Sequence, residues 1–331
     1  MKTSISLLFL ICTMTFCVNP MRHYLEPQKH NSTDSTQTPN TTQTSSSQIE
    51  KTFPNAPRSL SLNEWIGQEF VILEKQNMFK KFGYEMRLAD TSKTVDSVLE
   101  TGKKRYLKCD RFCNRIFKVI SITPFGNESI VSMKDSSGLR IEATTHKGAI
   151  KEIVLKNDLD SARQRWIGKY VYSKKGTIST LLESGFGSLK VKIQDSLYVY
   201  DVRWGTTPLP VNPIWLMVKT SRGEKGFIAL RYSWTNTMND LIQSNCAWSS
   251  EILEENPQLT YKWTLDMWNT INSHQITIGM NPDQVLLSWG EPLSKNQIVK
   301  DNLTQQYWKY PSQQLIFDKD SLINIENLSS N

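Results

Sequence analysis

The sequence lacks the short motifs by which most enzyme sites are identified. It contains no G-x-S-x-G nucleophile elbow, no H-E-x-x-H zinc motif, no phosphate-binding glycine loop and no dinucleotide fingerprint. Histidine is also scarce, with four in the chain, and only His146 and His274 lie beyond the polar N-terminal region. Because no nucleophile, base and orienting group stand together, the sequence predicts a protein that is not an enzyme and needs no cofactor or small-molecule substrate.

A hydrophobic run long enough to span a bilayer is missing as well. The most apolar segment, residues 5–16, follows a single Lys2 and has the length of a signal-peptide core. We therefore expect residues 1–17 to act as an export signal. Two alternatives stay open at Cys17: lipidation, although the preceding residues match a lipobox poorly, or conventional cleavage of the signal.

Apolar side chains are absent from residues 31–48, where eleven residues are Ser or Thr. Such a segment cannot bury enough surface to offset the entropy of ordering it. Residues 18–58 are therefore predicted to form a tether between the signal and the folded region. The Asn-x-Thr triplets of this segment leave a second interpretation open, a glycosylated stalk in a eukaryotic protein.

Cysteines are few, and beyond Cys17 only Cys109, Cys113 and Cys246 remain. No second pair completes a zinc site, so no metal is expected. Cys109 and Cys113 are four residues apart. In an oxidising compartment we expect them to form a local disulfide, with two ordinary thiols as the alternative.

What the chain does contain is a repeated β pattern. "NEWIGQEFVIL" at residues 63–73 and "QRWIGKYVYSK" at residues 164–174 share Trp-Ile-Gly and then continue in alternating β-forming residues. Each is followed by a further strand pattern and by a hairpin pattern. The repeat predicts two β modules in which Trp65 and Trp166 occupy equivalent positions.

The hairpin of each copy has a glycine in its turn, Gly138 in the first and Gly223 in the second. We place the first module at residues 59–156, with an insert over roughly residues 76–108, and the second at residues 157–250. Short strands at this spacing favour small barrels or sandwiches.

The second copy resembles bacterial SH3-like domains. "VKIQDSLYVYDVRW" and "PIWLMVKTSRGEKGFIAL" match a strand ending in Trp-Leu-x-Val, a Gly turn and a Gly-Phe-Ile strand. The resemblance covers residues 166–234, and the first copy is a more degenerate match. It implies small β-barrels that act as binding or spacing modules in exported proteins, some of which bind cell wall, and it brings no catalytic residues.

Near the C-terminus, "ITIGMNPDQVLLSWGEPLSKN" starts and stops a helix within a few residues. Asn281 is a natural N-cap, Pro282 suits the first helical position, and Gly290 suits a left-handed end. The buried face is predicted to carry Val285, Leu286 and Trp289. Three strand patterns then follow, so residues 251–331 are predicted to form an α+β unit.

Two further helices are predicted from periodicity. One spans residues 157–166 with Asn157 or Asp158 as its N-cap. The other spans residues 257–274, and its apolar stripe consists of Leu259, Trp263, Met267 and Ile271.

The C-terminal unit resembles the BamE/SmpA/OmlA-like fold. The resemblance is carried by Gly279-Met280, by Trp289-Gly290-Glu291-Pro292, by Trp308-Lys309-Tyr310 and by Phe317. It implies one helix packed on three strands, in a fold seen in exported bacterial proteins that include an outer-membrane assembly lipoprotein and β-lactamase inhibitors. That lipoprotein is short, whereas here the unit follows two β modules, so its specific function does not transfer.

Charge is unevenly distributed. The formal net charge is +7, yet residues 251–331 carry 5 basic and 10 acidic side chains. Basic residues interleave with aromatic ones over residues 102–118. Those that we expect to contact an anionic surface, lipid or wall polymer, are Lys103, Lys104, Arg105, Lys108, Arg111 and Arg115. Nucleic acid is not the expected partner, because an exported protein rarely meets it.

These observations together predict a mainly β protein with two tandem SH3-like barrels and a C-terminal BamE-like α+β domain. We expect a non-enzymatic binding or scaffold protein of the bacterial envelope, in the periplasm, at the outer membrane or secreted to the cell surface. Its partner would be an envelope protein, peptidoglycan or an anionic lipid surface. The alternative is a hydrolase or transferase of envelope polymer that uses the barrels for targeting.

Overall fold

The computed structural model describes residues 56–89, 98–101, 104–182, 185–206, 212–242, 246–300 and 303–328. The chain divides into residues 1–50 and 51–331, and every described residue belongs to the second unit. The predicted signal with Cys17, and all but the last three residues of the predicted tether, lie outside the described residues. The structure is mainly β, with a curled half-barrel sheet and a few helices, as the sequence predicts. In the described ranges, no helix has both the length and the apolar character needed to cross a membrane.

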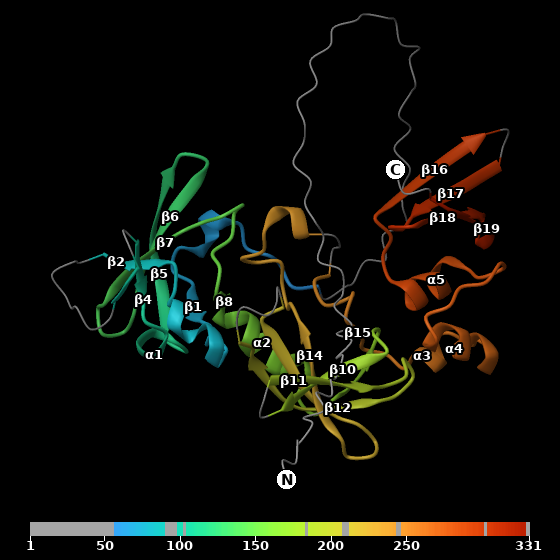
Figure 1. Cartoon of the computed structure of the whole chain (residues 1–331), viewed down its shortest axis with the longest axis horizontal. Helices are drawn as coiled ribbons and strands as arrows, with labels where there is room; N and C mark the ends of the chain where they lie inside the picture. Colours follow the sequence, from blue (N-terminus) through green and yellow to red (C-terminus); the bar gives the residue numbers. More distant parts are fainter. Residues whose placement is uncertain are drawn as a thin grey trace, which may run out of the picture. The chain divides into compact units, whose positions relative to one another are not determined.

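The first β module (residues 56–155) is built on a sheet with the order β2-β7-β6-β5-β1-β8 (Figure 1). Its strands are β1 (Glu69–Ile72), β2 (Met86–Leu88), β5 (Ile116–Phe125), β6 (Glu128–Lys134), β7 (Arg140–Thr144) and β8 (Ile153–Leu155). Around them lie η1 (Leu62–Trp65), η2 (Asn77–Phe82), α1 (Cys109–Phe112) and a hairpin of β3 (Val98–Thr101) and β4 (Lys104–Leu107). The last strand, β8, pairs with the first, β1, so the chain ends the module beside the strand with which its sheet began.

The second β module (residues 156–253) has the sheet order β11-β10-β14-β13-β12-β9-β15. It begins with α2 (Lys156–Trp166), and a short η4 (Asn239–Leu241) follows its hairpin. Its strands are β9 (Tyr170–Ser173), β10 (Thr177–Leu182), β11 (Gly185–Lys190), β12 (Leu197–Trp204), β13 (Ile214–Lys219), β14 (Lys225–Leu230) and β15 (Ile252–Leu253). With β10 in the place of β2, and β11 added outside it, the order is that of the first module.

The two Trp-Ile-Gly segments have the same local structure. Trp65 ends η1 and Trp166 ends α2, and both indoles are fully buried. The glycines that follow, Gly67 and Gly168, have φ angles of +87° and +81°, which an L side chain rarely adopts. Each glycine N–H donates 2.9 Å to a carbonyl of the next long strand, β5 in the first module and β12 in the second. The predicted equivalence of Trp65 and Trp166 therefore holds at the level of backbone geometry.

The long strands also carry the same irregularity. The register of β5 against β6 shifts just after Val119, and that of β12 against β13 shifts just after Val199. An extra residue at such a point bends the strand and increases its twist, which lets a small sheet curl. The predicted hairpins follow, and Gly138 and Gly223 turn them at φ +88° and +87°.

A shared core joins the two β modules. Val71, Leu73 and Val154 of the first module belong to the same buried cluster as Trp166 and most of the second module's inward side chains. Asn236, which follows β14, also reaches back to the first module. Its side chain bonds Ile150 N at 2.7 Å, Ile150 O at 2.9 Å and Ile153 O at 2.8 Å.

The N-cap of α2 lies two or three residues before the predicted one. β8 leads directly into the helix, so the N-cap position falls on Leu155, and neither Asn157 nor Asp158 caps it. Asp158 instead turns inward, where its Oδ2 accepts a 2.7 Å hydrogen bond from Ser233 Oγ. A buried partner elsewhere in the chain therefore outweighs the capping preference of Asp158.

The C-terminal module (residues 254–328) consists of short helices and a four-stranded antiparallel sheet in its described residues. The helices are α3 (Pro257–Thr260), α4 (Leu265–Asn272) and α5 (Pro282–Trp289). The strands, in the order β16-β17-β18-β19, are β16 (Ser294–Lys300), β17 (Leu303–Lys309), β18 (Gln313–Asp318) and β19 (Ser321–Asn327). The three predicted strands are β17 to β19, and β16 is a fourth that the sequence analysis missed.

The helix predicted over residues 257–274 is broken. Thr264 caps a new helix by accepting a hydrogen bond from Met267 N at 3.3 Å, so α3 and α4 are separate. Leu259 is 76% exposed and does not belong to the predicted apolar stripe. Trp268, which that stripe omitted, is buried instead.

The start and stop of α5 are as predicted, but its buried face is rotated. Asn281 and Gln284 form a reciprocal capping box, and Gly290 ends the helix at φ +78°. Leu287 is buried with Val285, whereas Trp289 is only half-buried and stacks edge-on against Tyr310.

Candidate functional site

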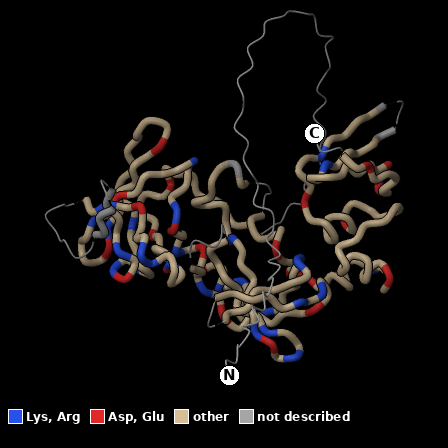
Figure 2. The backbone as a smooth tube through the Cα atoms, viewed as in Figure 1, with Lys and Arg blue, Asp and Glu red and all other residues tan. Residues whose placement is uncertain are grey.

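The predicted basic surface of the first module is only partly assembled in the described residues. Lys103 lies outside them, and only the backbone of Lys104 and Arg105 is described, in β4. Lys108 is half-buried at the start of α1, and Arg111 is exposed on that helix. Figure 2 shows both basic and acidic residues along the backbone of the two β modules.

Arg115 is held by the protein itself. It pairs with Asp135, and its guanidinium lies 5.3 Å from the Phe112 ring centroid and 5.4 Å from that of Phe117. Burial alone would raise the pKa of Asp135, but hydrogen bonds from Ser137 and the Leu139 amide, together with Arg115, lower it. The Arg115 charge is therefore balanced inside the module.

Cys109 and Cys113 are both free thiols in this structure, so their disulfide stays a prediction. They lie one helical turn apart on α1, where the Cys113 N–H donates to the Cys109 carbonyl at 2.9 Å. Cys109 is buried, and its Sγ lies 3.1 Å from the Tyr84 hydroxyl oxygen. Burial, and then the neighbouring Cys109, raise the pKa of Cys113, which disfavours its reactive thiolate form. Cys246 is buried as well, and burial raises its pKa to about 11.

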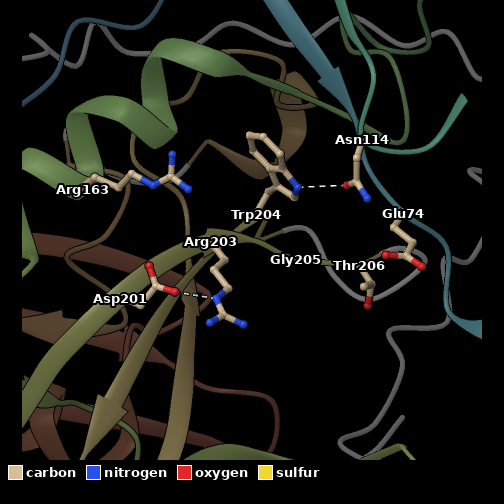
Figure 3. Close-up of a pocket in the computed structure, with 8 residues that line it drawn as sticks. All are labelled: Glu74, Asn114, Arg163, Asp201, Arg203, Trp204, Gly205 and Thr206. Carbon is tan, nitrogen blue, oxygen red and sulfur yellow. Dashed lines mark hydrogen bonds and ion pairs between the residues drawn. The ribbon is translucent and has the colours of Figure 1, made fainter.

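A polar pocket lies where the two β modules meet, and the sequence analysis did not identify it. Its volume is about 320 Å³. The residues that line it are Glu74, Asn114, Arg163, Asp201, Arg203, Trp204, Gly205 and Thr206 (Figure 3). Two come from the first module and six from the second, so neither module builds it alone.

One hydrogen bond joins the two sides of the pocket. The Trp204 indole N–H donates to Asn114 Oδ1 at 3.0 Å (Figure 3). Asn114 follows α1 at φ +59°, a conformation that asparagine tolerates better than most residues. The backbone N–H of Asn114 donates to the Ile72 carbonyl at 2.8 Å. This bond holds the backbone in place, so the Asn114 side chain faces Trp204.

Two guanidinium groups reach the pocket from different elements. Arg163 extends from α2, where its Nε donates to the Val202 carbonyl at 3.0 Å. Arg203 lies on β12 and donates from Nε to Asp201 Oδ2 at 2.6 Å. Arg163 also forms an ion pair through Nη1 with Asp160, at 3.8 Å. Arg203 bonds Asp201 through Nε, so its two terminal nitrogens are left to face solvent or a ligand.

Two hydrogen-bonding groups beside Gly205 have no partner among the described residues. They are the Thr206 hydroxyl, in the pocket lining, and the Trp215 indole N–H. A Cβ added to Gly205 would lie 2.2 Å from Trp215 Nε1, so the glycine is what allows the indole to approach the chain here. Buried polar groups are normally paired, and an unpaired hydroxyl in a pocket is therefore an indication of a ligand.

A second hollow, of about 360 Å³, is lined by Arg165, Trp166, Lys169, Tyr170 and Glu254, and three of these residues are paired with one another. Arg165 donates twice to Glu254 at 2.7 Å, and the Trp166 indole donates to the same carboxylate at 2.7 Å. Burial would raise the pKa of Glu254, but the bonds from Arg165 and Trp166 lower it overall. We assign this cluster to stability, since it anchors a core tryptophan.

The junction pocket therefore combines an indole wall, two guanidinium groups, carboxylates and the unpaired Thr206 hydroxyl. Such a set suits a small ligand part that carries both acceptors and donors, such as a peptide with a free carboxylate. Within the described ranges, no group of three His, Cys, Asp or Glu side chains is placed to hold a metal ion.

Comparisons with known proteins give no relatives. No protein-family model matches the chain, and neither the curated proteins nor the solved structures contain a significant match.

Proposed function

We propose that the protein is an exported, non-enzymatic binding or scaffold protein of the bacterial envelope that holds peptidoglycan peptide in the junction pocket. The observation that carries the proposal is the Trp204–Asn114 bond, which joins the two modules across a pocket where the terminal guanidinium nitrogens of Arg203 are free. Peptidoglycan is favoured over a lipid surface because the lining mixes cations, anions and an aromatic wall, whereas a lipid-binding face would be mainly basic.

The finer fold assignment belongs to the same proposal. We take both β modules to be SH3-like barrels and the C-terminal module to be a variant of the BamE-like fold. Support for the barrels comes from the strand order shared by the two modules, in which β8 returns to β1 and β15 returns to β9. Support for the C-terminal assignment comes from the capped α5 and from β17 to β19, although β16 and the separate α3 and α4 depart from a helix-and-three-strand unit.

The test is co-sedimentation of the purified protein with peptidoglycan sacculi, and separately with vesicles of phosphatidylglycerol and phosphatidylcholine. Trp204→Ala removes the indole wall, and Arg203→Ala removes one fork. The matched control is Arg222→Ala, because Arg222 is exposed and pairs with Glu224 two residues away, as Arg203 does with Asp201, but lies outside the pocket.

We expect sacculi to retain the protein, and we expect the two pocket variants to lose most of that binding while the control keeps it. Retention by vesicles alone would move the assignment to an anionic lipid surface. Release of soluble fragments from the sacculi would instead support the hydrolase alternative. Equal binding by all three variants would remove the pocket from the function.

A further inference from the structure

The outer face of the second β module carries a row of aromatic and basic side chains that no part of the proposed function uses. Tyr170 on β9 is opposite Tyr198 on β12, Tyr198 is opposite Lys219 on β13, and Lys219 is opposite Lys225 on β14. Directly opposed residues of antiparallel strands point to the same face, so the four form one line across the sheet. At ~4.8 Å between neighbouring strands, the line is roughly 14 Å long.

The tyrosines of this row are exposed and close together. Tyr170 is 57% exposed and Tyr198 is 38% exposed. Their ring centroids lie 5.5 Å apart with a 60° angle between the planes. Tyr200, at the bulge of β12, adds a third ring, which lies under the Lys225 ammonium at 5.7 Å.

The lysines of the row are not neutralised by nearby acids. Asp201, the nearest carboxylate on β12, pairs with Arg203, and Glu224 of the hairpin turn pairs with Arg222. Neither Lys219 nor Lys225 forms an ion pair with a residue that the structure describes, and both are exposed. The row therefore presents positive charge next to exposed rings.

The fold does not require aromatic residues in this row. In the first module, the same register positions are taken by Glu69, Lys118, Lys134 and Arg140. The first module therefore forms the same strand order with no aromatic residue at these four positions. The tyrosines of the second module thus add exposed apolar surface that the fold itself does not need, and such surface marks a binding site.

We propose that the row formed by Tyr170, Tyr198, Lys219 and Lys225, with Tyr200 beside it, binds an acidic polysaccharide. Flat tyrosine rings offer a rigid amphipathic surface on which the C–H faces of sugar rings can pack. The ammonium groups of Lys219 and Lys225 attract the carboxylates of the polysaccharide. The length of the row fits a few consecutive sugar units. The site is separate from the junction pocket and does not depend on it.

The experiment measures binding of the purified protein to fluorescently labelled oligogalacturonate, a chain with both sugar rings and carboxylates. Three probes separate the contributions: a neutral glucan oligomer, a polyphosphate of similar length and an oligothymidylate. The variants are Tyr170→Ser/Tyr198→Ser and Lys219→Gln/Lys225→Gln. The matched control is Lys118→Gln/Lys134→Gln, which changes the equivalent positions of the first module. Trp204→Ala tests independence from the junction pocket.

We expect oligogalacturonate to bind, and each double variant of the row to weaken it about tenfold, with the lysine effect shrinking as salt is raised. The first-module control should leave the affinity unchanged. A loss of affinity in Trp204→Ala would place the oligogalacturonate in the junction pocket and would overturn the proposal. Polyphosphate and neutral glucan should bind at least about tenfold more weakly than oligogalacturonate. The proposal is overturned if the first-module control weakens binding as much, if polyphosphate binds equally well, or if oligothymidylate binds more tightly. Circular dichroism of each variant shows whether it is folded. Tyr170→Phe/Tyr198→Phe keeps the rings and should retain binding, and a loss of binding in this folded variant would contradict packing of sugars on the rings.

Discussion

Lys118, Ser132 and Glu142 of the first β module occupy the register positions that Tyr198, Met217 and Phe227 occupy in the second. In the first module, Glu142 accepts a 2.8 Å hydrogen bond from Arg87 on the neighbouring strand β2. In the second, Met217 and Phe227 form a small apolar cluster with Trp215, and Phe186 of β11 packs against it.

The inward positions do not differ in this way. Val119 and Met133 in the first module, and Val199 and Val218 in the second, are all buried opposite one another. The comparison teaches that the inner face, the bulge and the turn glycines specify this backbone. The outer face is free to vary, because it contributes little to closing the sheet.

The largest effect on stability is expected when either of the equivalent tryptophans, Trp65 or Trp166, is replaced. Trp65→Ala and Trp166→Ala each remove a fully buried indole, so each should reduce the free energy of unfolding by about 3–5 kcal/mol. Trp166→Ala should cost about 1 kcal/mol more, because its indole donates to the Glu254 carboxylate at 2.7 Å, whereas the Trp65 indole donates to the Leu60 carbonyl at 3.4 Å. Urea unfolding followed by circular dichroism measures both.

Trp166→Phe is the control, since it keeps an aromatic ring and loses the N–H donor. If either alanine variant lost less than about 1 kcal/mol of unfolding free energy, the two positions would not be equivalent, because deleting a buried indole leaves a destabilising cavity.

The second prediction concerns a buried carboxyl group on α2 that has no buried counterpart on η1. α2 carries Asp158, whose pKa burial raises to about 6, whereas the buried residue of η1 in the first module is Trp65. Between about pH 4 and pH 6 the folded protein therefore holds a proton that the unfolded chain has lost, so stability falls as the pH rises through this window. The fall should be on the order of 3 kcal/mol.

Asp158→Asn cannot ionise and can still accept the hydrogen bond from Ser233 Oγ. Unfolding free energies of the two proteins, measured across this pH range, should diverge as the pH rises, with the variant the more stable above pH 6. Parallel pH profiles would show that Asp158 does not titrate in the folded state.

The third prediction contrasts Gly205 with Phe125, which stand at matching ends of β12 and β5. Gly205→Ala should cost about 1–3 kcal/mol, because the new Cβ forces the Trp215 indole to move. Phe125→Ala should change stability by less than about 0.5 kcal/mol, because that ring is largely exposed. Thermal unfolding, with near-ultraviolet circular dichroism to report on Trp215, tests both, and a neutral Gly205→Ala would contradict the assigned contact.

The smallest effect is expected at the two hairpin turns, where the modules should behave alike. Gly138→Ala and Gly223→Ala each place a Cβ at positive φ and should each cost about 1 kcal/mol. Asparagine at either position should cost less, because it tolerates this conformation. If the two alanine variants differed by much more than this, the hairpins would not be equivalent in energy.

Local sequence signals predicted much of the fold. Alternating patterns gave the long strands of both modules, and Trp-Ile-Gly marked the same turn twice because the glycine must adopt positive φ. Asn281, Pro282 and Gly290 set the limits of α5, since caps act within one turn of the helix. Each of these features depends on residues a few positions apart, which is the range over which periodicity and turn chemistry operate.

The remaining features depend on partners distant in the chain, so they follow from the tertiary structure. Asp158 turned inward because Ser233 lies there, and Arg115 was withdrawn from the predicted basic surface because Asp135 and two phenylalanine rings surround it. The junction pocket requires Asn114 and Trp204 to meet. No spacing rule connects residues that far apart, because their contact follows from how the two modules pack on a shared core. Local residue patterns were thus enough to place the long strands, the glycine turns and the limits of α5, whereas the packing of the modules sets which of their polar side chains are left to bind a ligand.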